Sequence, residues 1–185
     1  HANHANWGNN SQIVKDDYLE GTLGFCRKLI DAGVERIALH PRALKQKFKG
    51  KADWSFVEAL ARELPVPVIG NGDVDSGEAL AARLEGQTKG LWAGVMVGRA
   101  AIKEPWIFSL RASAPPRENI GLKFLDYLSQ YQPPEFHLSR AQRFFFYFCD
   151  NLKWGNYLKT VINRETSLTG IEKVWKKHFA ENEEP

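Results

Sequence analysis

The sequence predicts an α/β protein in which a parallel sheet is followed by an all-helical segment. Three short apolar runs alternate with helical patterns in the first part of the chain. Such alternation is typical of βαβ units, whose strands run parallel. After Phe108 the alternation stops, and the remaining apolar residues recur only at helical spacing.

The composition is that of an ordinary globular protein. The chain has 185 residues, 43% of them hydrophobic and 25% charged, and a net charge of +3. No apolar run reaches the roughly 18 residues of a membrane span and nothing resembles a signal peptide, so we expect a cytoplasmic protein with no membrane partner. Cys26 and Cys149 lie within helical patterns, which favours free thiols over a disulfide.

The α/β part follows in order along the chain. Residues 1–14 have no period and are predicted to be irregular; the repeated His-Ala-Asn could hold a metal, but an irregular start is the better interpretation. Gly33 ends the first helix, Asp53 is a good N-cap for the second, and Pro65 closes that helix. The predicted elements are helix 16–32, strand 34–39, helix 54–64, strand 66–70, helix 76–85, strand 93–97 and a helix from residue 99.

The remaining sequence predicts a small helical domain. Residues 112–116 resemble a hinge, and Pro133-Pro134 ends the first helix after it. Ser139 is the expected cap of the next helix, whose apolar face carries phenylalanines. Two more helices are expected at 156–164 and 169–180. The predicted domains are therefore an irregular segment 1–14, an α/β part 15–113 and a helical part 114–185.

Polar groups and glycines stand where each predicted strand ends. His40 and Arg42 follow the first strand, Asn71-Gly72-Asp73 the second, and Gly98-Arg99 the third. In a (β/α)8 barrel the carboxyl ends of the strands form the active-site face, and the last two loops hold a phosphate. On the alternative interpretation, Asn71 and Asp73 only cap the next helix and Arg99 is a surface residue.

Three strands cannot close a barrel. We therefore expect the C-terminal part of a TIM (β/α)8 barrel, about three strands, followed by the small all-α domain. Either the other strands were removed or another chain supplies them.

Two basic regions are candidates for contact with an anionic macromolecule. The stretch from Arg42 to Lys51 holds five positive charges, including Lys45 and Lys47, and no acid. Residues 140–177 hold eight Lys or Arg against three acids; Arg140 and Arg143 share one helix face, and Lys153 follows. Both regions could equally be solvated surface.

Five segments in this order resemble the tRNA-dihydrouridine synthases. The segments are Leu39-His40-Pro41-Arg42, Gly50-Lys51-Ala52-Asp53-Trp54, Val68-Ile69-Gly70-Asn71-Gly72-Asp73, Gly94-Val95-Met96-Val97-Gly98-Arg99-Ala100 and Pro105-Trp106-Ile107-Phe108. The resemblance implies an FMN-dependent TIM barrel with a helical domain that helps hold tRNA. It also implies reduction of uridine to 5,6-dihydrouridine with hydride from NADPH or NADH.

The resemblance also implies roles for single residues. Residues expected to bind FMN are His40, Asn71, Gly72, Asp73, Gly98 and Arg99. Residues expected to meet substrate or tRNA are Arg42, at the mouth of the site, and Lys45, Lys47, Arg140, Arg143 and Lys153.

The family's catalytic cysteine and flavin-contacting lysine have no counterpart here, so we expect no catalytic residue in this chain. No His/Cys cluster has the spacing of metal ligands, so we expect no metal site. We expect the polypeptide alone to be inactive and to associate with an N-terminal barrel half or with a second copy of itself. Two other functions stay open: an FMN-dependent barrel oxidoreductase of a small molecule, and a non-catalytic nucleic-acid-binding remnant.

Overall fold

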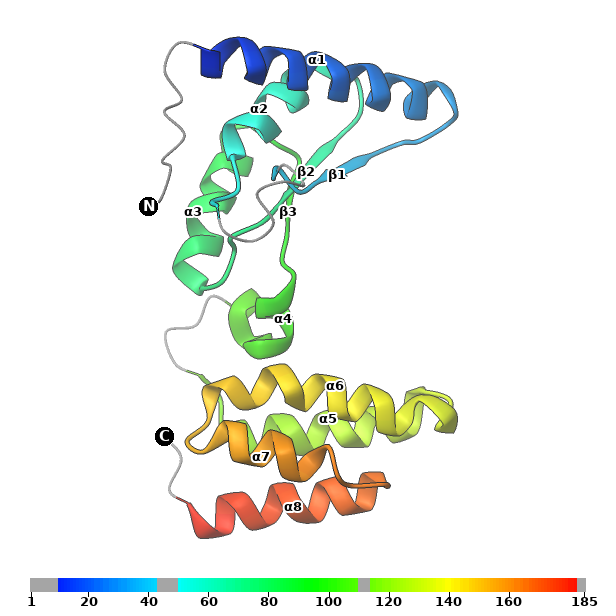
Figure 1. Ribbon diagram of the computed structural model, residues 1–185, viewed down its shortest axis with the longest axis vertical. Coiled ribbons are helices and arrows are strands. Elements are labelled where there is room, and N and C mark those ends of the chain that lie inside the picture. Colours follow the sequence, from blue (N-terminus) through cyan, green and yellow to red (C-terminus); the bar gives the residue numbers. More distant parts are fainter. Residues whose placement is uncertain (1–9, 43–49, 110–113, 183–185) are drawn as a thin grey trace, which may run out of the picture. The chain divides into compact units, whose positions relative to one another are not determined.

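The computed structural model describes residues 10–42, 50–109 and 114–182, with side chains from residue 18 onward (Figure 1). The chain forms two compact units, His1–Gly98 and Arg99–Pro185. The sequence pattern placed the boundary near residue 114 instead. The difference arises because the segment after Gly98 packs on the helical part, as described below.

The first unit contains a parallel sheet of three strands, as the sequence predicts. The strands are β1 (Ile37–Leu39), β2 (Val68–Asn71) and β3 (Gly94–Met96), in that order across the sheet. The register pairs Leu39 with Gly70 and Gly70 with Val95. The strands are shorter than predicted at their amino ends, but their carboxyl ends lie side by side at one edge of the sheet.

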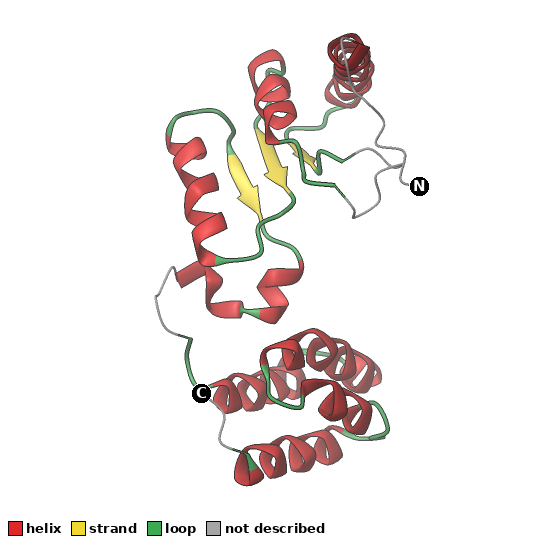
Figure 2. Cartoon of the chain, turned by 60° about the vertical axis from the view of Figure 1, so that its left-hand side comes forward, coloured by secondary structure: helices red, strands yellow, loops and turns green. Residues whose placement is uncertain are grey.

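Helices α1 (Asn10–Asp31), α2 (Trp54–Glu63) and α3 (Gly77–Thr88) complete this unit (Figure 2). The start of α1 corrects the prediction of an irregular segment up to residue 14. Gly33 ends α1 with φ of 97°, a left-handed conformation that favours glycine. The predicted cap of α2 is confirmed, since the Asp53 carboxylate accepts the N–H of Ser55 at 3.1 Å.

Helix α2 packs closely on one face of the sheet because Gly70 has no side chain. A Cβ atom built on Gly70 would lie 2.2 Å from the Trp54 ring. Trp54 in turn lies against Trp92, with ring centroids 4.8 Å apart, and the Trp92 indole fills the space beside Gly86 of α3. Two tryptophans opposite two glycines therefore set the distances between sheet and helices.

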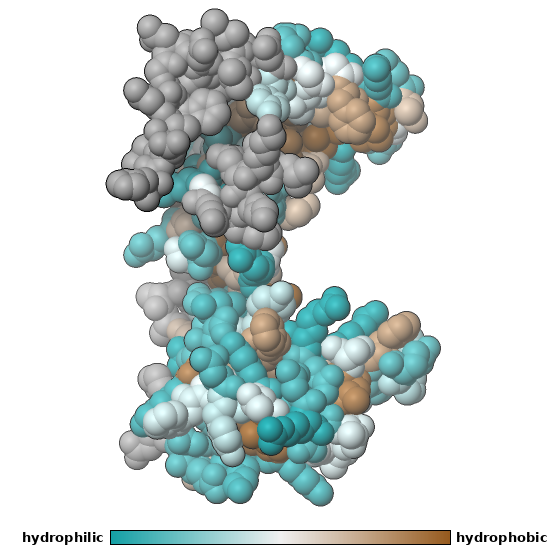
Figure 3. Space-filling view, viewed as in Figure 1, coloured by the Kyte–Doolittle hydropathy of each residue, from teal (hydrophilic) through white to brown (hydrophobic). Residues whose placement is uncertain are grey.

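The opposite face of the sheet is more open. Side chains alternate along a strand, so Ala38, Ile69 and Gly94 share this face. Ala38 is exposed and Ile69 is half-buried, whereas Ile37 and Val68 on the helix-covered face are buried. Further apolar surface of this unit lies over α1 (Figure 3). Phe25 of this helix is 62% exposed.

The second unit is all helical. Its helices are α4 (Arg99–Lys103), α5 (Arg117–Tyr131), α6 (His137–Phe148), α7 (Gly155–Ile162) and α8 (Leu168–Glu181), with 3-10 turns η2 (Pro105–Ser109), η3 (Pro134–Phe136) and η4 (Cys149–Asn151). Phe145, Phe148 and Trp175 are fully buried between α5, α6 and α8. The predicted phenylalanine stripe is thus core.

Segment α4–η2 belongs to this core. The Trp106 ring lies edge-on to Phe148, with centroids 6.3 Å apart, and Ile107 is buried. Asn151 donates a hydrogen bond to the Lys103 carbonyl. These contacts explain why the division of the chain falls at Gly98–Arg99.

Helix α6 begins two residues before the predicted cap. Turn η3 runs directly into α6 at His137, and Ser139 lies inside the helix with its hydroxyl donating to the Phe136 carbonyl at 3.2 Å. Cys26 and Cys149 are both buried, and they are not joined to each other in a disulfide, as predicted. Within the described ranges, no helix is both long enough and apolar enough to cross a membrane.

The packing at Gly70 gives a stability prediction. We expect Gly70→Ala to lower the free energy of unfolding by about 1–3 kcal/mol, because the added methyl group overlaps the Trp54 ring. Urea unfolding measures this change. The matched control is Gly94→Ala on the neighbouring strand, where the new Cβ meets Ile69 at an ordinary 3.5 Å. Equal stability of the two variants would contradict the packing argument.

Candidate functional site

The carboxyl ends of the three strands carry a group of polar side chains, which we call the strand-end cluster: His40, Arg42, Asn71, Gly72 and Asp73. His40 directly follows β1, Asn71 is the last residue of β2, and Met96 ends β3. His40 Nδ1 and Asn71 Oδ1 are 2.7 Å apart, and Asn71 Nδ2 donates to the Met96 carbonyl at 2.8 Å. One line of hydrogen bonds therefore crosses all three strands.

This line fixes the protonation of one His40 nitrogen. The Met96 carbonyl can only accept, so the Asn71 amide must turn its nitrogen toward it and its oxygen toward His40. His40 Nδ1 must then carry a proton and donate. The other ring nitrogen, Nε2, is left to act on a bound group, as an acceptor in the neutral ring and as a donor in the charged one.

A second set of contacts joins the loop after β2 to the loop after β1. The Asp73 carboxylate forms an ion pair with Arg42 through one oxygen and accepts the Ala52 N–H at 2.5 Å through the other. The Arg42 side chain is only 7% exposed and that of Asp73 31%. Arg42 is thus engaged inside the protein, whereas the sequence interpretation expected it at an open mouth.

The backbone between Asn71 and Asp73 makes a tight turn that needs glycine. Gly72 has φ of 117° and Asp73 has φ of 54°, both in the left-handed region. A Cβ on Gly72 would lie 2.8 Å from the Ala52 Cβ and 3.0 Å from His40 Cε1. The Trp54 indole N–H donates to the Gly72 carbonyl at 3.0 Å, and this hydrogen bond stabilises the turn.

The surroundings of Asp73 keep its carboxylate charged. Partial burial by itself raises the pKa of this carboxyl, but the hydrogen bonds from Ala52 and Arg42 and the charges of Arg42 and His40 lower it more. The net result is a pKa below the ordinary value of 3.8. The group therefore stays ionised throughout the neutral range.

The capping alternative does not hold for this loop. The N-cap of α3 is Ser76, whose hydroxyl accepts the Ala79 N–H at 3.1 Å. Asn71 and Asp73 are instead committed to the two hydrogen-bonded sets described above. Neither side chain is an ordinary helix cap.

Sequence reasoning missed Arg83 of α3. Its guanidinium carbon lies 4.4 Å from the centre of the Trp54 ring. Burial lowers the pKa of Arg83, and the nearby charge of Asp73 opposes that effect. Nothing in the sequence around Arg83 singles it out, because its position follows from the packing of α3 beside α2.

The other predicted residues follow β3, belong to the second unit or lie outside the described part. Gly98 is exposed after β3, and a Cβ there would meet nothing within 4 Å. Arg99 is the first residue of α4, in the second unit. Lys45 and Lys47 lie outside the described residues.

The predicted basic residues of the second unit are exposed. Arg140 and Arg143 lie on α6, and Arg140 is bonded to Gln132 and sits 5.0 Å from the centre of the Phe136 ring. Lys153 lies between η4 and α7. Among the residues whose side chains are described, no group of three His, Cys, Asp or Glu is placed to hold a metal ion.

The lowered pKa of Asp73 gives a pH prediction. At neutral pH we expect Asp73→Asn to lower the free energy of unfolding by about 1–3 kcal/mol, because the variant leaves buried Arg42 without its anion. A carboxyl with a lowered folded-state pKa contributes stability above its unfolded pKa and loses it as pH falls through the folded value. The difference should therefore shrink as pH drops below the ordinary 3.8.

Urea unfolding of the two proteins between neutral and acidic pH measures this difference. Asp75→Asn, on the exposed neighbouring aspartate, is the matched control and should change little. A difference between wild type and Asp73→Asn that stays constant with pH would contradict the role of the charge.

Comparison with known proteins identifies relatives of this chain. A family model described as dihydrouridine synthase (Dus) matches residues 10–166. The chain is 46% identical over 81 residues to a probable tRNA-dihydrouridine synthase of Aquifex aeolicus, covering 44% of this chain and 25% of the relative. It is 37% identical over 105 residues to a probable tRNA-dihydrouridine synthase of Rhodobacter capsulatus, covering 54% of this chain and 32% of the relative.

A further match is the tRNA-dihydrouridine synthase B of Vibrio parahaemolyticus, 37% identical over 81 residues, which covers 42% of this chain and 23% of the relative. The chain thus spans between about a quarter and a third of the length of these curated relatives. The family model covers most of the chain and includes the whole strand-end cluster. The chain belongs to the dihydrouridine synthase family.

Proposed function

We propose that this chain is the C-terminal part of a flavin-dependent TIM barrel with its helical tRNA-binding domain. Together with the rest of the barrel it reduces uridine to 5,6-dihydrouridine in tRNA. The observation that carries the proposal is the hydrogen-bond line His40–Asn71–Met96 across the carboxyl ends of three parallel strands. In a (β/α)8 barrel, that edge is where substrates and cofactors bind.

The strand-end cluster fits the phosphate and ribityl part of FMN. Gly98 leaves open space beside the backbone after β3, where a phosphate could approach the amides, and Arg99 next to it supplies a positive charge. His40 Nε2 can meet the flavin ring. FMN, once reduced by NADPH or NADH, would supply the hydride that reduces the uracil C5–C6 bond.

Asp73 takes a different role from a direct phosphate ligand. Its two oxygens are already engaged by Arg42 and the Ala52 N–H, and a carboxylate repels a phosphate. We propose that Arg42 and Asp73 are positioning residues that hold the Gly72 turn in place. Gly72 and Asn71 then face the cofactor from a fixed backbone.

We propose that the proton donor of the reaction comes from another part of the barrel. Both cysteines are buried in helical packing, and burial raises the pKa of the Cys26 thiol, which makes it a poor acid–base group at neutral pH. We therefore propose that the polypeptide alone does not form dihydrouridine. The rest of the barrel, or a second copy of this chain, would complete the structure. We propose a cytoplasmic setting for the reaction.

The exposed basic residues of the second unit are the proposed tRNA contacts. Arg140, Arg143 and Lys153 are all exposed there. Lys45 and Lys47, which lie outside the described residues, are further proposed tRNA contacts.

A flavin titration tests the cofactor proposal. We expect FMN fluorescence to be quenched on binding, and the Kd to rise about tenfold or more in Arg99→Ala and Asn71→Ala, since each removes a polar contact to the bound group. Arg62→Ala and Gln87→Ala, which alter exposed side chains of α2 and α3, are matched controls and should bind as wild type does. Equal affinity of all five proteins would contradict the proposed site.

Binding of tRNA tests the proposed substrate. We expect the double variant Arg140→Ala/Arg143→Ala to bind tRNA more weakly and with a smaller dependence on salt, since about two fewer phosphates release counterions. Fluorescence anisotropy over a range of salt concentrations measures both. The double variant Lys176→Ala/Lys177→Ala removes the same charge from α8 and is the control. Unchanged salt dependence in the α6 variant would rule out this face as a phosphate contact.

A further inference from the structure

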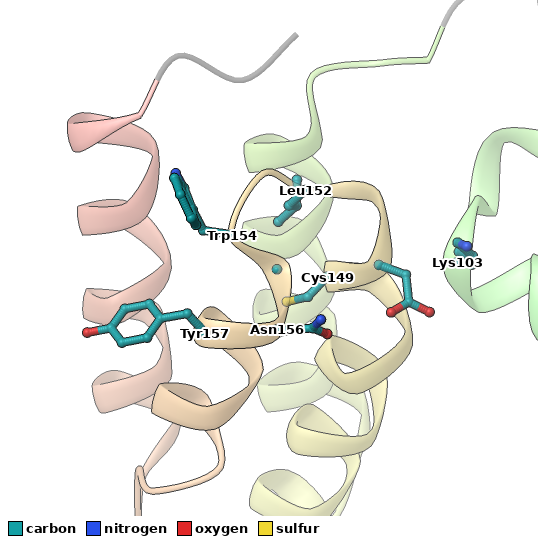
Figure 4. A pocket seen from close by; sticks show the side chains of 8 residues that line it. Lys103, Cys149, Leu152, Trp154, Asn156 and Tyr157 are labelled. Atoms are coloured by element: carbon teal, nitrogen blue, oxygen red, sulfur yellow. The ribbon is translucent and has the colours of Figure 1, made fainter.

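A pocket in the helical unit lies between α4, η4 and the start of α7 (Figure 4). Its volume is about 470 Å³, within the usual range of small-ligand sites. Trp154 and Tyr157 line it on the α7 side, and Lys103 of α4 lies on the other side. Asn156 and Asp150 contribute polar groups between them.

The Trp154 side chain lies on the surface, and its backbone adopts an unfavourable conformation. The residue has φ of 58° and ψ of 19°, a left-handed conformation that bulky side chains rarely adopt. Its ring is 65% exposed, so core packing does not explain the choice of tryptophan. If only the turn mattered, glycine would fit this position better than tryptophan, because glycine adopts the left-handed conformation without strain. Such an outlier points to a function for the side chain.

The turn that carries Trp154 is held firmly. The Leu152 N–H donates to the Cys149 carbonyl and the Gly155 N–H to the Leu152 carbonyl, each at 3.1 Å. Gly155 cannot carry a side chain, because a Cβ there would lie 1.9 Å from the Cys149 carbonyl oxygen. The aromatic ring is therefore presented on a fixed support, which lowers the entropy lost when a ligand binds.

The exposed groups suit a planar, hydrogen-bonding ligand. Within the described part of the chain, neither the Trp154 indole N–H nor the Tyr157 hydroxyl has a hydrogen-bond partner, and neither ring stacks on another. Tyr157 is 71% exposed and lies in the first turn of α7, three residues after Trp154. Aromatic rings of this kind bind unstacked nucleobases, with stacking tolerant of the base.

The charges around the pocket favour a polyanion. Lys103 and Lys153 lie at or beside it, and the acid that lines it, Asp150, is neutralised by an ion pair with Lys159. Lys159 also lies 5.1 Å from the centre of the exposed Phe146 ring. Basic groups beside aromatic platforms are typical of single-stranded nucleic-acid surfaces.

We propose that this pocket binds one unpaired nucleobase of the RNA substrate, with Trp154 as the stacking platform and Lys103 and Lys153 near the flanking phosphates. The inference rests on the proposed function in one respect, namely that RNA is the substrate. It adds a base-recognition site in the helical unit, separate from the strand-end cluster.

The test uses Trp154→Gly, which removes the aromatic ring and at the same time relieves the strain of the left-handed backbone. The probes are a short fluorescein-labelled oligouridylate and unfractionated tRNA, and anisotropy gives the Kd. We expect Trp154→Gly to weaken binding of both probes about tenfold by removing the stacked ring. The slope of log Kd against log salt should stay unchanged, since no charge is lost. Trp154→Phe should retain most of the affinity.

Folding and specificity are controlled separately. Trp154→Gly should unfold at the same temperature as wild type or higher, because glycine accepts the left-handed backbone. The matched control Tyr131→Ala removes another aromatic residue, also 71% exposed, from α5 and should leave binding unchanged.

Three results would overturn the inference, and they are distinguishable. Wild-type binding of tRNA with equal affinity in Trp154→Gly overturns the pocket but leaves tRNA as the substrate. Failure of wild type to bind either probe overturns the proposed RNA substrate and the pocket with it. A change in sedimentation coefficient in Trp154→Gly without a change in RNA affinity would make the ring a protein contact instead.

Discussion

The Trp54 indole is the group on which the geometry of the first unit depends. It occupies the space that a side chain on Gly70 would need, so it sets the distance between α2 and β2. Its N–H donates to the Gly72 carbonyl, so it also holds the turn after β2. Arg83 of α3 and Trp92, which lies between α3 and β3, both contact the same ring. One side chain thus links both helices to the loop that carries Asn71 and Asp73.

The ion pair between Arg42 and Asp73 also stabilises this turn, because Asp73 is part of it. A buried ion pair adds little net stability, because desolvation offsets the attraction, but the loss of one partner is costly. Such a pair therefore contributes more to fixing the positions of the two loops than to the net stability of the fold. Here it fixes the loop after β1 to the loop after β2, two segments joined in sequence only through α2. Asp73 bonds the Nη2 atom of Arg42, whereas the buried Nε atom has no hydrogen-bond partner in the described part of the chain.

Much of the fold could be predicted from the sequence because its signals are local. The alternation of apolar runs and helical patterns predicts the three parallel strands, and Asp53 predicts the start of α2. The polar residues after each strand predict which groups gather at the strand ends, since parallel strands end at one edge. His40 and Asn71 indeed meet there. That these residues bind FMN stays a prediction.

What the sequence could not predict depends on contacts between distant segments. The division at Gly98–Arg99 follows from Trp106 packing on Phe148 and from the bond between Asn151 and Lys103. Burial of Arg42 depends on Asp73, 31 residues away.

The polar groups at the strand ends are of two kinds. Some are bonded to one another, and others are available to a ligand. Arg42, Asp73 and the Ala52 N–H satisfy one another, so they offer little to a ligand and mainly fix the backbone. His40 Nε2 and the backbone at Gly98 are available to a ligand. The hydrogen bond with Asn71 fixes the orientation of the His40 ring. A ligand at this edge would therefore meet a ring nitrogen of fixed direction and a backbone held rigid by the ion pair behind it. Pre-organisation of this kind lowers the entropy lost on binding, which is how a loop of small residues can become a precise binding site.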